Sequence, residues 1–244
     1  MKTSRYCKLD AVRGIALLNM IAYHAIWDLV YLYNFKWDWY WSERGYIWQQ
    51  GICWTFIFLS GFCLPLGKRP VKRGATVFLG GAVITAVTLA FMPQNRVVFG
   101  VLTLIGSCMI LAGVLDGWLK RLCPVFGMAV CFLLFCLTRD INEGWIGFEA
   151  FHLCEVPRGL YANMVTAYFG FPENSFYSTD YFSLFPWLFL FLSGYFLFRY
   201  LEKRELLGIF EKSVFPPVEW LGRHSLIIYM LHQPIIYLLF ELIL

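Results

Sequence analysis

The sequence predicts an all-α protein, a polytopic bundle of transmembrane helices that forms one domain over residues 1–244. Hydrophobic residues make up 59% of the chain and charged residues only 15%, which is too apolar for a soluble domain of this length. Seven stretches approach the span of about 20 residues that crosses the hydrocarbon core. Because lipid offers no hydrogen-bond partner to irregular backbone, closed helices are expected.

The seven predicted spans are runs of mainly apolar residues. They are 9–32, 46–66, 75–92, 98–117, 124–138, 182–200 and 223–242. The first does not look like a cleaved signal peptide, because charges occupy its opening turn. We therefore expect a multi-pass protein of the inner (plasma) membrane, in contact with lipid.

The distribution of Lys and Arg predicts a cytoplasmic N-terminus. In that orientation 15 of the 20 Lys and Arg residues, Lys2 among them, fall on the inner side and five on the outer side. An odd number of spans then places the C-terminus outside, unless 139–181 holds a further or re-entrant helix. This asymmetry accounts for the net charge of +4, so no nucleic-acid partner is expected.

The first predicted span carries ionisable residues that a simple anchor does not need. Arg13, His24 and Asp28 all lie within it, and such groups cost about 2.5 to 3.5 kcal/mol each inside a bilayer. His24 and Asp28 are four positions apart and share a helix face. This span therefore predicts a functional site.

The last predicted span holds a second polar cluster. Arg223 and His224 lie at its inner end, while His232 and Gln233 lie near its middle. Pro234 removes a backbone donor and clashes with the preceding turn, so a kink is expected. A buried His-Gln pair at a kink needs polar partners from a neighbouring helix.

Two connections differ from ordinary loops. The short segment 67–74 holds Lys68, Arg69, Lys72 and Arg73, which suit either the positive-inside rule or a phosphate-binding edge. The long aromatic segment 139–181 is expected to cover a site on the outer face, with 159–171 as an interfacial or half-inserted helix. Cysteine and histidine spacings predict neither a disulfide framework nor a metal site.

Three motifs resemble the heparan-alpha-glucosaminide N-acetyltransferase catalytic-domain family and its small bacterial relatives. They are LDAVRGIALLNMIAYH at 9–24, FLSGF at 58–62 with the basic stretch after it, and LGRHSLIIYMLHQP at 221–234. The first is also similar to integral-membrane sugar O-acyltransferases, which carry Arg-Gly followed by a histidine at the His24 position. The animal lysosomal enzyme instead has Asn there and a histidine in the next outer loop. This chain has no histidine between His24 and His152.

The resemblance implies an acyl-CoA-dependent acetyltransferase that modifies a sugar or glycan hydroxyl or amine on the far side of the membrane. His24 is then the general base and Asp28 its orienting acid, and His232 and Gln233 are the further candidates for catalytic residues. Oxyanion donors remain open among Gln233, Asn19, Gln49 and Gln50. The phosphates of acetyl-CoA, the donor substrate, are expected to bind cations on the inner side. These are Arg13, Lys68, Arg69, Lys72, Arg73, Arg223 and His224.

Two other classes also explain buried polar groups. A secondary transporter or proton-coupled carrier uses similar residues, although no inverted repeat is visible in the sequence. A structural subunit uses polar side chains to join helices. The sequence leaves the acceptor and the oligomeric state open, with a homodimer as one candidate.

Overall fold

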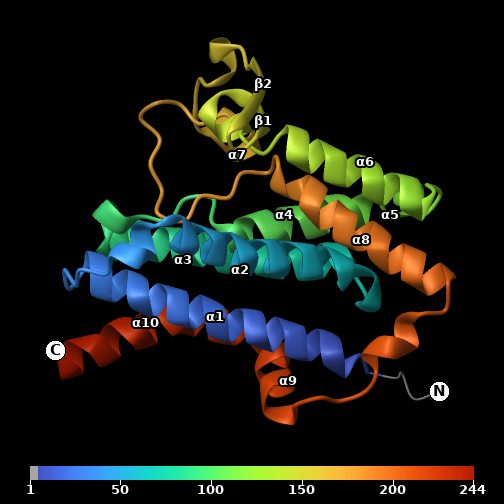
Figure 1. Cartoon of the computed structure of the whole chain (residues 1–244), viewed down its shortest axis with the longest axis horizontal. Coiled ribbons are helices and arrows are strands. Elements are labelled where there is room, and N and C mark those ends of the chain that lie inside the picture. Colours follow the sequence, from blue (N-terminus) through green and yellow to red (C-terminus); the bar gives the residue numbers. More distant parts are fainter. Residues whose placement is uncertain (1–4) are drawn as a thin grey trace. The chain divides into compact units, whose positions relative to one another are not determined.

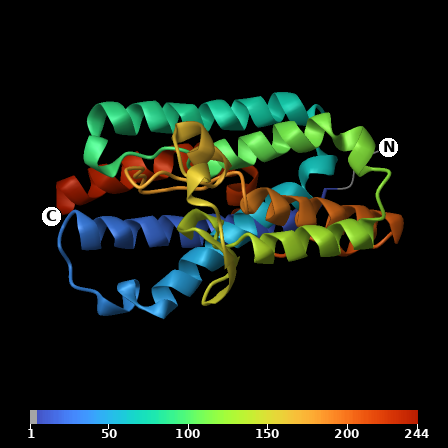
Figure 2. The same cartoon turned by 90° about the horizontal axis from the view of Figure 1, so that it is seen from above.

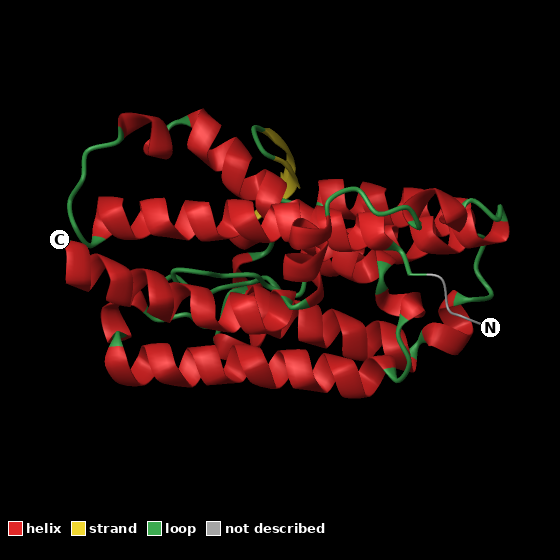
Figure 3. Cartoon of the chain, turned by 90° about the horizontal axis from the view of Figure 1, so that it is seen from below, coloured by secondary structure: helices red, strands yellow, loops and turns green. Residues whose placement is uncertain are grey.

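The structure is a computed structural model that describes residues 5–244, so Lys2 lies outside the described residues. The described chain is mostly helical, and its one sheet is a two-stranded hairpin (Figure 3). The prediction of a helical protein is confirmed, and the hairpin is the one departure from the predicted all-α fold within the described residues. The ten α-helices of the described chain are α1 (Cys7–Tyr31), α2 (Glu43–Phe62), α3 (Pro70–Phe91), α4 (Val101–Val114), α5 (Asp116–Leu119), α6 (Pro124–Leu137), α7 (Met164–Phe169), α8 (Trp187–Lys203), α9 (Pro216–Arg223) and α10 (Ser225–Ile243).

Helix length and composition support membrane insertion. Of the described helices, α1, α3 and α10 are long and apolar enough to cross a bilayer, while α4 and α6 are shorter apolar helices. A helix of 14 residues such as α4 extends about 21 Å, less than the roughly 30 Å of hydrocarbon. Each of the seven predicted spans contains a helix. Their number as membrane crossings and the cytoplasmic N-terminus remain predictions.

The chain divides into two compact units. The first takes the chain up to Leu59 together with Glu205–Leu244, and the second is Ser60–Arg204. In the first unit, α1 packs against α9 and α10 (Figure 1). Leu17, Met20 and Ile52 form its buried apolar cluster.

Two glycines allow α1 and α9 to approach closely. A Cβ on Gly14 would lie 2.1 Å from the carbonyl oxygen of Val218, and one on Gly222 would lie 1.9 Å from that of Asp10. Side chains larger than hydrogen do not fit at either point. The glycines of the first and last motifs therefore set the packing of α1 on α9.

The second unit contains two helix pairs, α3 with α4 and α6 with α8 (Figure 2). The α3–α4 pair is antiparallel, because Gly74 approaches Ile110 while Gly81, later in α3, approaches Thr103, earlier in α4. Phe135 of α6 is fully buried. Small residues at the α3–α4 contact are typical of helix pairs in membranes.

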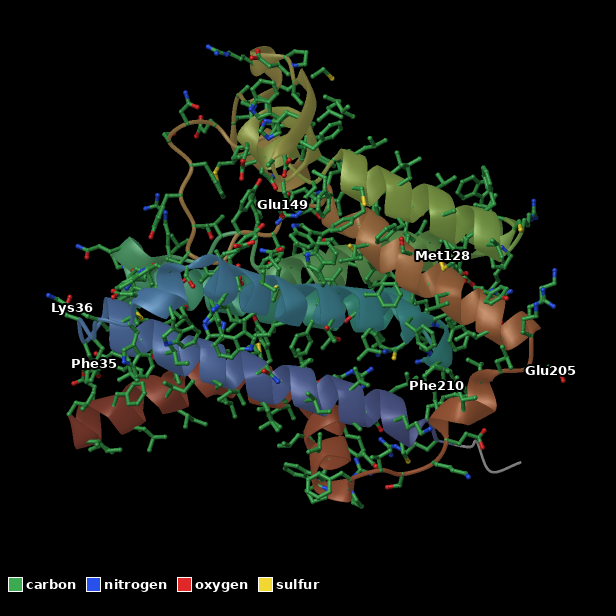
Figure 4. All side chains as sticks on the ribbon, viewed as in Figure 1. Phe35, Lys36, Met128, Glu149, Glu205 and Phe210 are labelled. Carbon is green, nitrogen blue, oxygen red and sulfur yellow. The ribbon has the colours of Figure 1, made fainter. Side chains whose placement is uncertain are left out.

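The segment 139–181 is ordered by a hairpin and one short helix. Strands β1 (Trp145–Phe148) and β2 (Phe151–Glu155) pair antiparallel. Glu149, at the hairpin turn, lies 3.5 Å from the Arg139 guanidinium (Figure 4). Within the predicted interfacial stretch 159–171, α7 has six residues and begins at a capping box of Asn163 and Thr166. The expected covering of an outer site by this segment remains a prediction.

Candidate active site

Helix α1 brings His24 and Asp28 onto one face, as the sequence spacing predicts. Both lie in its C-terminal half. The Asp28 side chain is fully buried, whereas His24 is half-buried. A carboxyl group that is completely removed from solvent needs a polar partner.

Helix α10 supplies that partner. It runs alongside α1 in the same direction (Figure 1), as successive contacts along both helices show. The ring centroids of His24 and His232 lie 4.9 Å apart. Nε2 of Gln233 donates a hydrogen bond of 2.6 Å to Oδ1 of Asp28. The structure therefore joins the two predicted polar clusters into one site.

The Asp28 partner differs from the one expected. No hydrogen bond joins His24 to Asp28 in the part of the chain that the structure describes, and Gln233 takes the place that the sequence assigned to the His24 ring. Asp28 orients the amide of Gln233, which is adjacent to His232. A direct Asp-His contact is thus not present in this arrangement.

The backbone of α10 selects the tautomer of His232. Its Nδ1 lies 2.5 Å from the carbonyl oxygen of Tyr229. Because a carbonyl only accepts, Nδ1 carries the hydrogen and Nε2 of the neutral ring keeps a free lone pair. Pro234 lies inside α10, which continues as one helix to Ile243.

Three buried polar atoms of this site have no hydrogen-bond partner among residues 5–244. They are Nε2 of His232, Oδ2 of Asp28 and Oε1 of Gln233. Unpaired buried acceptors cost about 1–3 kcal/mol each and are uncommon in folded proteins. All three are acceptors in this assignment, so the site suits a ligand that donates hydrogen bonds, such as a hydroxyl or an amine.

The candidate oxyanion donors are partly engaged. Nδ2 of Asn19 donates to the Ile15 carbonyl at 3.0 Å, and its Oδ1 accepts from Trp48 at 3.0 Å. Nε2 of Gln50 donates to Oε1 of Gln49 at 3.2 Å. Each amide nitrogen has two hydrogens, so Asn19 and Gln233 each keep a second donor.

The predicted cations of the first unit have different surroundings. Arg13 pairs with Asp10 at 3.3 Å, and Asp10 also pairs with Arg5 at 3.0 Å. Arg223 ends α9 and is exposed. His224 is also exposed, and its Nδ1 lies 2.9 Å from the Trp220 carbonyl.

The predicted basic edge lies in the second unit. Lys68, Arg69, Lys72 and Arg73 are all exposed around the start of α3. The partial positive charge of a helix N-terminus adds to these four cations. This surface has the electrostatic character of an anion-binding edge.

Sequence reasoning missed an aromatic cluster that contacts His24 through Tyr23. Tyr23 has ring contacts with His24 at 5.9 Å, with Trp48 at 5.4 Å and with Tyr40 at 5.1 Å. Trp39 contacts Trp48 at 6.0 Å and is 43% exposed. The aromatic density of 37–48 in the sequence was the available signal.

The helical fold and the long apolar helices are those of a membrane protein, and its polar cluster joins α1 to α10. The chain matches the sequence profile described as heparan-alpha-glucosaminide N-acetyltransferase, catalytic, over residues 5–234, and it belongs to that family. The match includes both units and all the predicted site residues. No curated protein and no solved structure matches the chain. The family supports a transferase and lends no support to the transporter alternative.

Proposed function

We propose that this protein moves an acetyl group from cytoplasmic acetyl-CoA to a hydroxyl or amine of a sugar or glycan on the extracytoplasmic side. In this proposal, residues 1–244 form one multi-pass acyltransferase domain of the inner membrane. The main support is that the His24 ring contacts the His232 ring and that Asp28 accepts a hydrogen bond from Gln233. Family membership supplies the reaction class.

His24 acts as the general base. It takes the proton from the acceptor O–H or N–H, whose oxygen or nitrogen then attacks the thioester carbonyl carbon. The carbon–sulfur bond breaks, and the CoA thiolate leaves and takes up the proton. A histidine suits both steps because its ordinary pKa lies near neutrality.

His232 is the second candidate base. Its Nδ1–H is bound to Tyr229, which leaves the Nε2 lone pair available to a hydroxyl or amine. Gln233, held by Asp28, is well placed beside it to orient the acceptor. The two histidines are distinguished by separate alanine substitutions, described in the Discussion.

The exposed cations bind the phosphates of acetyl-CoA. Support comes from the four cations at the start of α3, and we assign Arg13, Arg223 and His224 to the same role in the first unit. The test is calorimetry with acetyl-CoA. Arg69→Glu with Arg73→Glu should abolish binding, while Lys212→Glu, also an exposed cation, serves as the control. Unchanged affinity in the double variant would reject this role.

The aromatic group of Tyr23, Tyr40, Trp48 and Trp39 supports a carbohydrate acceptor. Aromatic faces provide apolar contact area for a ligand whose hydroxyls need hydrogen-bond partners. The deciding experiment incubates the purified chain in liposomes with radiolabelled acetyl-CoA and a panel of sugars and glycans. Appearance of an acetylated sugar supports the proposal. CoA release at the same rate with and without every acceptor would contradict it.

A further inference from the structure

Two adjoining cavities in the second unit are not part of the site described above. The larger has a volume of about 490 Å³, and its basic lining residues are Lys120, Arg121, Arg199 and Lys203. The smaller, of about 280 Å³, shares Lys120, Arg199 and Glu202 with it. Ligand pockets commonly measure about 300–1,000 Å³. The pair is therefore large enough for a substantial part of a small molecule.

The lining includes side chains held in place by hydrogen bonds and ion pairs, in addition to surface cations. Tyr195 is fully buried, and its hydroxyl donates to Oδ1 of Asp116 at 3.0 Å. Oδ2 of Asp116 in turn lies 2.5 Å from Nζ of Lys120. Arg199 pairs with Glu202. Buried Tyr195 thus anchors a carboxylate that holds Lys120 at the wall shared by the two cavities.

Positive charge dominates the larger cavity. Four cations face one acid, Glu202, on its lining. Arg121 and Lys203 have no ion pair with any residue of the described chain closer than 4.0 Å. Two cations are therefore available to a ligand without breaking an existing pair.

The smaller cavity continues toward the predicted basic edge. Gly67 and Pro70, which flank Lys68 and Arg69, both line it. The Arg73 guanidinium packs directly on Gly67, where a Cβ would clash with it. Cations of the 68–73 segment therefore border the same cavity system.

We propose that these adjoining cavities bind a ligand rich in phosphate esters through Lys120, Arg121, Arg199 and Lys203. Two sources present that chemistry: the phosphorylated nucleotide end of acyl-CoA and the headgroup of an anionic lipid. The nucleotide source rests on the proposed function, whereas the site itself does not. Arg and Lys form charge-assisted hydrogen bonds to phosphate oxygens, and Arg does so with two parallel bonds.

Inorganic pyrophosphate is the direct probe. The full chain in uncharged phosphatidylcholine nanodiscs is titrated by calorimetry, with Arg121→Glu plus Lys203→Glu as the test variant. Binding to the test variant should weaken by about tenfold or more. Arg204→Glu, a neighbouring exposed cation outside both linings, is the control and should stay within about twofold. Equal pyrophosphate affinity in wild type and test variant would overturn the proposal.

Cys123 gives an independent readout because it lines the larger cavity and is exposed. Backbone N–H groups of Phe126 and Val125 lower the pKa of its thiol, which favours alkylation. Pyrophosphate should slow iodoacetamide labelling of Cys123 and leave exposed Cys154 unaffected. An unchanged Cys123 rate at saturating pyrophosphate would also count against the site.

Two further arms identify the source. If CoA displaces pyrophosphate and its affinity falls about tenfold in the test variant, the nucleotide is the ligand. If CoA does not compete but nanodiscs of phosphatidylglycerol block pyrophosphate, the lipid headgroup is the ligand. Failure of CoA to bind wild type anywhere would contradict the proposed function while pyrophosphate binding still supported this site.

Discussion

Asp28 of α1 and Gln233 of α10 are joined by a hydrogen bond of 2.6 Å, although 205 positions separate them in the sequence. The bond lies beside the contact between the His24 and His232 rings. Together these contacts bring the first and last motifs into one polar site. The proposed chemistry depends on this pairing of two helices.

Exchanging the two polar groups tests the pairing. Gln233→Leu should lower the free energy of unfolding by about 1–3 kcal/mol, because the buried Asp28 carboxyl loses its donor. It should lower transfer activity as well. The double variant Asp28→Asn with Gln233→Glu restores one acid and one amide, and it should recover much of the stability. Thermal melts in detergent measure both. Additive losses in the double variant would show that the two side chains do not act as a pair.

Removal of either histidine separates the candidate bases. His24→Ala should reduce acetyl transfer by about 10²–10⁴-fold, because a positioned base contributes that much. Acetyl-CoA binding, measured by calorimetry, should stay at the wild-type level. If His24→Ala transfers normally and His232→Ala does not, the base is His232. Normal transfer by both variants would remove histidine from the mechanism.

The close contact of α1 with α9 predicts that alanine destabilises the protein more at Gly14 than at Gly51. Gly14→Ala should destabilise the protein by about 1–3 kcal/mol, because the new Cβ meets the Val218 carbonyl. Gly51→Ala in α2 is the matched control, since a Cβ there meets nothing within 4 Å. Melting temperatures compare the two. A larger loss from Gly51→Ala than from Gly14→Ala would contradict the observed packing.

Asp180 predicts a pH effect on stability. Burial raises the pKa of its carboxyl from 3.8 to about 6. The hydrogen bond that Oδ2 accepts from the Val101 N–H opposes this shift. Asp180 therefore binds its proton more tightly in the folded state than in the unfolded state. The stability that this protonation contributes to the folded state falls as the pH rises from about 4 to about 6. Melting temperatures across that range should show the fall, and Asp180→Asn should flatten it. A wild-type slope unchanged in the variant would assign the effect to another group.

Two exposed cysteines test the predicted orientation. Cys123 belongs to a predicted inner segment and Cys154 to the outer segment 139–181, and both are exposed. The reagent is a maleimide that does not cross the inner membrane, applied to cells whose outer barrier lets it through and whose inner membrane is intact. It should label Cys154 and leave Cys123 unlabelled. Permeabilised membranes provide the control in which both react. The reverse pattern would place the N-terminus outside.

Much of the candidate site was predictable from spacing within a single helix. His24 and Asp28 share a face because a helix repeats every 3.6 residues, and the structure keeps them there. The hydrogen bond from Gln233 to Asp28 was not predicted, because it joins two helices that are far apart in the sequence. The role of Asp28 in orienting His24 stays a prediction. Side chains four apart on a helix are neighbours without necessarily being bonded, and a donor from another helix can bind the same acceptor.

The sequence by itself determined the membrane class, the helix positions and the two polar clusters, because composition and local spacing decide these properties. The tertiary structure decided which clusters meet and that His232 keeps its Nε2 lone pair. It also decided the close packing of α1 on α9 at Gly14 and Gly222. In lipid, apolar faces of different helices are nearly equivalent, so local pattern does not specify which helices become neighbours.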